Sequence, residues 1–238
     1  MTDVMRAARG PAVGHRATIL VALGAMAASV ASVAGLIDGV RERADLSSLD
    51  VPTLSWLVTH RQPWATTALT GVTELGGELV LVVVSALALL VLLWRRRLVE
   101  ALLLSVALGT AETASLLLKH LVARARPPAA DVLGPVEHTL SFPSGHTLGA
   151  AALSLGLAYL WWRSRRTVPR AVVGLVAAST ASLVMATSRL YLADHWLTDV
   201  LGSMAIAVGV MAAVVLLDLR LQRGESAPPA PQPALAAS

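Results

Sequence analysis

Cysteine is absent from this sequence, and lysine is nearly so. Without cysteine, disulfide bonds, thiol nucleophiles and thiolate metal sites are all excluded, whatever compartment the protein occupies. Lys119 is the only lysine, and arginine supplies the rest of the 19 basic residues. Any chemistry must therefore come from histidine, serine, the acidic residues, arginine and this one ammonium group.

Charged residues are also scarce, at 14% of the 238 residues, whereas hydrophobic residues make up 55%. The mean hydropathy of +0.68 is too apolar for an ordinary soluble domain and is typical of a membrane protein. The formal charge of +4 does not indicate a nucleic-acid partner, because the arginines form short clusters between apolar runs and do not alternate with aromatic residues. Their pattern instead indicates orientation signals at membrane boundaries.

Six apolar runs approach the length of about 20 residues that a helix needs to cross a bilayer. They are 17–37, 79–94, 98–118, 147–162, 171–187 and 196–219. The sequence therefore predicts an all-α membrane protein, with six transmembrane helices in a bundle. The first run ends in Ser-Val-Ala, as a cleaved signal peptide would, but its length favours a retained span. Segment 51–77 is partly helical in pattern and is expected to lie on the membrane surface or to re-enter the membrane.

Arginine clusters set the predicted orientation of the bundle. They lie in the N-terminal tail, at 95–97, at 163–170 and at 220–223, and with six spans all four segments fall on one side. The positive-inside rule makes that side cytoplasmic. Both termini are therefore expected in the cytoplasm of a bacterial-type cell, and the loops 38–71, 120–143 and 188–194 outside its plasma membrane.

The composition divides the chain into three predicted parts. A short basic tail at 1–16 is expected in the cytoplasm, and the membrane-embedded domain covers 17–223. The last part, 224–238, is rich in proline and alanine without periodicity, which predicts a disordered tail.

His195 and Asp199 stand four residues apart at the start of the last apolar run. On a helix the two side chains share one face, so the carboxylate can accept a hydrogen bond from the imidazole and fix its tautomer. This arrangement makes His195 a candidate nucleophile or base. The same spacing could also hold zinc or make a purely structural contact.

Three cations and the start of a helix are expected at the same external face. Lys119, Arg126 and Arg189 together suit a phosphate, because guanidinium forks match its oxygens and an ammonium adds a compact charge. Ser144 can cap the helix that follows it, and Gly145 lets the backbone come close to an anion. The sequence therefore predicts an anion site built without metal.

Two imidazoles, those of His146 and His195, flank the predicted anion site. On chemistry alone, either ring could attack phosphorus while the other protonates the leaving oxygen. Asp199 favours His195 as the nucleophile, because a carboxylate partner stabilises the positive charge that grows on the ring during attack. No cofactor is needed for such a reaction.

Three motifs resemble the signature motifs of the type 2 phosphatidic acid phosphatase superfamily. They are Lys119-x6-Arg126-Pro127, Pro143-Ser144-Gly145-His146 and Ser188-Arg189-x5-His195-x3-Asp199. They occur in the family order, and none of the motif residues departs from the pattern. The six-helix layout extends the similarity over most of the chain.

The resemblance implies a role for each motif residue. His195 would form a phosphohistidine with Asp199 orienting it, and His146 would be the general acid and then the base for water. The phosphoryl oxygens would be bound by Lys119, Arg126, Ser144, Gly145 and Arg189, with no metal ion.

The expected function is metal-independent hydrolysis of a lipid phosphate or diphosphate at the outer face of the membrane. Polyprenyl diphosphates such as undecaprenyl diphosphate, phosphatidic acid and phosphatidylglycerophosphate are the candidate substrates that the resemblance implies. A transporter or a non-hydrolytic lipid-phosphate binding protein is the alternative from another class. A vanadate-dependent peroxidase would share the anion site, but the embedded architecture argues against it. No protein partner is predicted.

Overall fold

The computed structural model describes residues 15–225, and within this range every regular element is a helix. The helices are α1 (His15–Glu42), the 3-10 helix η1 (Asp45–Leu49), α2 (Asp50–Thr59), α3 (Pro63–Leu75), α4 (Glu78–Trp94), α5 (Leu98–Val122), α6 (Gly145–Ser164), α7 (Val168–Tyr191) and α8 (Leu197–Glu225). The all-α prediction is confirmed. The predicted tails, 1–16 and 224–238, fall almost entirely outside the described residues.

All six predicted spans coincide with helices, namely α1 and α4 to α8. By length and apolar composition alone, α1, α5, α7 and α8 could each cross a membrane. The shorter α4 joins α3 across a bend of 47°, and this pair could make a fifth span. The predicted count of six is therefore not fully reproduced, because α6 is less apolar than the other spans.

Helix α6 owes its lower hydropathy to small and polar residues that let it lie at the centre of the bundle. It packs against α4, α5, α7 and α8. At Gly156 a Cβ atom would stand 3.0 Å from a methyl group of Leu104, and at Gly149 the same distance from Leu81. The central core includes Leu103, Leu148, Ala152 and Val214.

Large apolar side chains on the outside of the bundle face away from this core. Leu87 of α4 is 56% exposed, and Val21 of α1 is 72% exposed. Such a surface would be a liability in water and suits contact with lipid chains. The protein is thus a multi-pass membrane protein.

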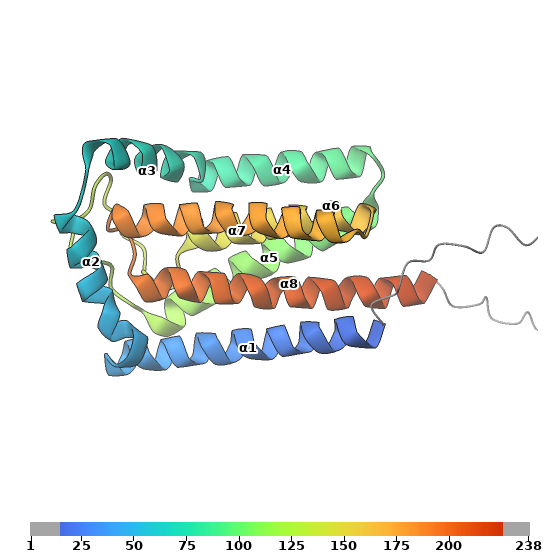
Figure 1. Cartoon of the computed structure of the whole chain (residues 1–238), viewed down its shortest axis with the longest axis horizontal. Coiled ribbons are helices and arrows are strands. Elements are labelled where there is room, and N and C mark those ends of the chain that lie inside the picture. Colours follow the sequence, from blue (N-terminus) through green and yellow to red (C-terminus); the bar gives the residue numbers. More distant parts are fainter. Residues whose placement is uncertain (1–14, 226–238) are drawn as a thin grey trace, which may run out of the picture.

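The helices run up and down, so one end of the bundle collects the C-terminal ends of α5 and α7 and the N-terminal ends of α6 and α8 (Figure 1). Helix α2 lies across this same end (Figure 1). Segment 51–77, expected on the surface or re-entrant, is formed by α2 and α3.

A buried ion-pair network closes the opposite end. The Asp218 carboxylate of α8 accepts hydrogen bonds from Tyr159 Oη at 2.7 Å and from Arg163 Nε at 2.9 Å. Arg163 also donates to Glu100 of α5 at 3.1 Å. This network joins α5, α6 and α8 far from the predicted anion site.

Candidate functional site

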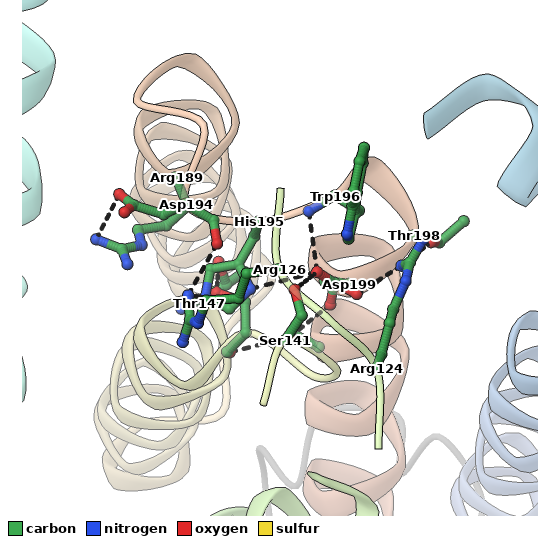
Figure 2. A network of polar contacts seen from close by, with 12 residues as sticks. Arg124, Arg126, Ser141, Thr147, Arg189, Asp194, His195, Trp196, Thr198 and Asp199 are labelled. Carbon is green, nitrogen blue, oxygen red and sulfur yellow. Dashed lines mark hydrogen bonds and ion pairs between the residues drawn. The ribbon is translucent and has the colours of Figure 1, made fainter. Parts of the chain in front are cut away.

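Helices α7 and α8 position His195 through a short connection in which the chain turns back into the bundle. Its Nδ1 lies 3.4 Å from Asp199 Oδ2, and the two side chains are 1% and 0% exposed. The predicted pairing of these two residues is therefore present (Figure 2). Asp199 Oδ2 also accepts hydrogen bonds from the Trp196 N–H at 2.9 Å and from Ser141 Oγ. These bonds hold the carboxylate in place beneath the imidazole.

The hydrogen bonds of His195 define its tautomer. Arg126 Nη1 lies 3.2 Å from His195 Nε2, and a guanidinium can only donate. Nε2 must therefore accept, which leaves the proton on Nδ1, where it is donated to Asp199. Burial lowers the pKa of His195 to about 4, against the opposing effect of Asp199. At neutral pH the ring is uncharged, with the Nε2 lone pair directed toward the cations.

Two guanidinium groups, from Arg126 and Arg189, lie on either side of one carboxylate. Glu137 Oε2 accepts a hydrogen bond from Arg126 Nη2 at 2.5 Å, and Glu137 Oε1 accepts one from Arg189 Nη2. Burial raises the pKa of Glu137, but the charges of Arg189 and Arg126 outweigh burial and hold that pKa below its usual value. Glu137 is therefore an ionised anion bound where the sequence predicts a phosphate.

Arg189 is held by further partners and still has an unused donor. Its Nη1 lies 3.1 Å from Asp194 Oδ2 and 3.2 Å from Thr73 Oγ1. Its Nε is buried without a hydrogen-bond partner in the described part of the chain. Asp194 faces Arg189 (Figure 2), and burial raises its pKa to about 6 in spite of this cation.

Helix α6 begins at the site as predicted. Ser144 is its N-cap, and Ser144 Oγ accepts hydrogen bonds from Thr147 N at 3.4 Å and from Thr147 Oγ1 at 3.0 Å. Gly145 and His146 form the first turn, whose N–H groups and dipole favour an anion.

Lys119 lies in the last turn of α5, and its contact differs from those of the two arginines. Its Nζ donates a hydrogen bond of 2.8 Å to the carbonyl oxygen of Leu140 in the loop between α5 and α6. The ammonium thus fixes Leu140. The next residue, Ser141, donates a hydrogen bond to Asp199. All eight predicted site residues lie at this one end of the bundle.

Sequence reasoning missed four residues that hold these groups, namely one arginine, one serine and two acids. Arg124 lies within the six-residue gap of the first motif and contacts Asp199 Oδ1 at 2.6 Å. Ser141 precedes the second motif by two residues. Glu137 and Asp50 lie in segments without a motif, and no local pattern distinguishes them from other polar residues. A cluster of three or more His, Asp or Glu side chains able to hold a metal ion is not found among residues 15–225.

Comparison with known proteins finds one matching family and one similar curated protein. The sequence profile of the PAP2 superfamily matches residues 98–223. Phosphatidylglycerophosphatase B of Bacillus subtilis (strain 168) is 30% identical over 168 residues, which cover 70% of this chain and 81% of that protein.

Two solved structures are similar to most of this chain. The crystal structure of the transmembrane PAP2 type phosphatidylglycerolphosphate phosphatase from Bacillus subtilis matches with a TM-score of 0.72 and 25% identity, covering 82% of this chain and 98% of that one. Aquifex aeolicus LpxE matches with a TM-score of 0.54 and 20% identity over 69% of this chain and 94% of that one. The second likeness bears on the fold alone.

Proposed function

Because this chain belongs to the PAP2 superfamily and is a membrane lipid phosphatase, we propose that it hydrolyses a lipid phosphate through a phosphohistidine formed on His195. One observation carries the proposal. His195 donates from Nδ1 to Asp199 and presents the Nε2 lone pair beside Arg126, which is the tautomer that a nucleophilic imidazole needs. The bound Glu137 carboxylate and the unused Nε donor of Arg189 support an anionic substrate at this point.

The proposed reaction has two displacements at phosphorus. His195 Nε2 attacks, the bond from phosphorus to the leaving oxygen breaks, and the imidazolium form of His146 gives that oxygen a proton and becomes neutral. Neutral His146 then takes a proton from water, the water oxygen attacks phosphorus, and the P–N bond breaks with its electron pair returning to Nε2. The charge on the equatorial oxygens is stabilised by Lys119, Arg126, Arg189 and the first turn of α6, where Ser144 and Gly145 lie.

The substrate is proposed to keep its hydrocarbon tails in the bilayer while its phosphate reaches the end of the bundle. Phosphatidylglycerophosphate is supported by the name of the Bacillus relative, and phosphatidic acid and undecaprenyl diphosphate remain the other candidates. The site is proposed to face the outside of a bacterial plasma membrane, with both termini in the cytoplasm. The arginine clusters at the opposite end of the bundle support this orientation.

Phosphate release across a panel of lipids tests the proposed function. Purified protein in detergent is supplied with these three lipids, each with and without EDTA. We expect release from at least one lipid at a rate that EDTA leaves unchanged, because the charges on the phosphoryl oxygens are met by side chains. Loss of activity in EDTA that added Mg²⁺ restores would contradict a metal-free reaction.

The acidic limb of the pH profile is expected well below the usual histidine pKa of about 6.5. Protonated His195 cannot attack, so activity falls as pH drops through its pKa, and burial moves that pKa down to about 4. The measurement is kcat/KM between pH 3.5 and 8, corrected for the ionisation of the lipid phosphate. A limb assigned to the enzyme at pH 6.5 or above would contradict a buried, uncharged nucleophile.

Glu137→Gln is expected to lower the inhibition constant of vanadate about tenfold. Vanadate resembles phosphate, and in the parent protein it must displace a carboxylate from Arg126 and Arg189. The neutral amide keeps the size of the side chain and competes less. Glu74→Gln, at an exposed acid near the end of α3, is the matched control and should leave inhibition unchanged. Equal inhibition of the Glu137 variant and the parent would show that the carboxylate does not compete.

A further inference from the structure

Arg124 joins two buried carboxylates that come from distant parts of the chain. Its Nη1 lies 2.6 Å from Asp199 Oδ1, and its Nη2 forms an ion pair with Asp50 Oδ2. The guanidinium also lies over the ring of Trp196, 5.4 Å from the ring centroid. Figure 2 shows Arg124 on the side of Asp199 that is turned away from His195.

Asp50, the first residue of α2, is 2% exposed. Besides Arg124, it accepts hydrogen bonds from the Thr198 N–H at 2.9 Å and from Thr198 Oγ1 at 2.8 Å. Thr198 lies in the first turn of α8, whose free N–H groups favour an acceptor of this kind. Asp50 therefore holds Arg124 and the start of the helix that carries Asp199 at the same time.

We propose that Asp50 is a positioning residue for the hydrolysis, acting through Arg124 on Asp199 and so on His195. This inference rests on the proposed function. The two carboxylate oxygens of Asp199 have different partners, since Oδ1 binds Arg124 whereas Oδ2 binds His195. Arg124 stays on Oδ1 alone because its other branch is occupied by Asp50.

Loss of the Asp50 charge frees one branch of the Arg124 fork. A guanidinium pairs most favourably with both oxygens of a single carboxylate, so Arg124 would shift toward a bidentate pair with Asp199. That shift competes with His195 Nδ1 for Oδ2 and loosens the orientation of the nucleophile. Asp50 lies outside the segment that matches the superfamily, 98–223. Its contact with Arg124 therefore links the N-terminal part of the chain to the site within that segment.

Asp50→Asn tests the proposal, with Asp218→Asn as the matched control. Both acids are buried and paired with arginine, but Asp218 lies at the other end of the bundle. We expect Asp50→Asn to lower kcat about 10- to 100-fold with KM changed less than about twofold, since a small displacement of a reacting group carries a cost of this size. Asp218→Asn should lower thermal stability and leave kcat unchanged. A parent kcat in Asp50→Asn, or a loss confined to KM, would refute the positioning role.

A double-mutant cycle separates this route from general damage to the fold. If Asp50 acts through Asp199, adding Asp50→Asn to Asp199→Asn should cost less than about twofold in kcat. If the loss of kcat in the double variant equals the product of the two single losses, Asp50 does not act through Asp199.

If the Asp50 variant does not fold, Arg124→Lys tests the same proposal. Lysine keeps the charge but cannot bind both carboxylates as a planar fork, so kcat should again fall about 10- to 100-fold. Parent kcat in Arg124→Lys would then overturn the inference. Failure of the proposed function is distinguishable, because it would appear as full activity in a His195 variant whatever the Asp50 variant does.

Discussion

Replacing His195 with alanine is expected to lower kcat for phosphate release by about ten thousandfold or more, because the reaction loses the atom that bonds to phosphorus. The methyl group leaves Arg126, Arg189 and Lys119 in place, so lipid phosphate should still bind. The measurement is phosphate release in detergent alongside equilibrium binding of the same lipid. His120→Ala, at an exposed position one residue beyond Lys119, is the matched control and should retain the parent rate.

The same variant decides between a hydrolase and a protein that only binds lipid phosphates. Binding requires the cations, whereas turnover requires the imidazole. The lipid is labelled with radioactive phosphorus in its phosphate group, and the reaction is stopped with alkali, which preserves phosphohistidine. The parent protein should then retain label, and His195→Ala should not. Release at the parent rate by His195→Ala would show that His195 is not the nucleophile.

Replacing Asp199 with asparagine is expected to lower kcat about a thousandfold and to change KM little. Asparagine keeps the shape of the side chain, but its amide cannot stabilise the charge that His195 gains during attack, and its NH2 group can favour the wrong tautomer. The two oxygens of Asp199 bind His195 and Arg124. The substitution should therefore act on the imidazole more than on substrate binding.

Asp194→Asn is the comparison for this result. Asp194 is a buried acid next to His195 in the sequence, but its carboxylate binds Arg189 and not the imidazole. Its loss should therefore change KM, through Arg189, and spare kcat. A larger fall in kcat for Asp194→Asn than for Asp199→Asn would show that Asp194, and not Asp199, supports the nucleophile.

Much of the site could be predicted because its residues sit at the ends of long apolar runs. Hydropathy locates such runs, and their alternation in direction then requires that Lys119, Ser144, Arg189 and His195 meet at one end of the bundle. Helical spacing was enough to pair His195 with Asp199.

The groups that hold the site were not predictable in this way. Glu137 reaches Arg126 and Arg189 from a loop without regular structure, and Asp50 reaches Arg124 across 74 positions of sequence. Neither contact follows from periodicity, because each depends on how loops and short helices fold over the end of the bundle. The count of six spans is not fully reproduced for a related reason, since α6 is enclosed by other helices and needs less apolar surface than a helix facing lipid.

The carboxylate of Glu137 between the two arginines also bears on how a reaction cycle ends. A cluster of cations strong enough to bind a lipid phosphate would retain inorganic phosphate after hydrolysis, and turnover would then be limited by product escape. If the Glu137 carboxylate returns to Arg126 and Arg189 as phosphate departs, this step is an exchange of ions, and the two guanidinium groups are not left without an anion. In the resting protein, part of the positive charge of this site is thereby balanced by a carboxylate of the same chain.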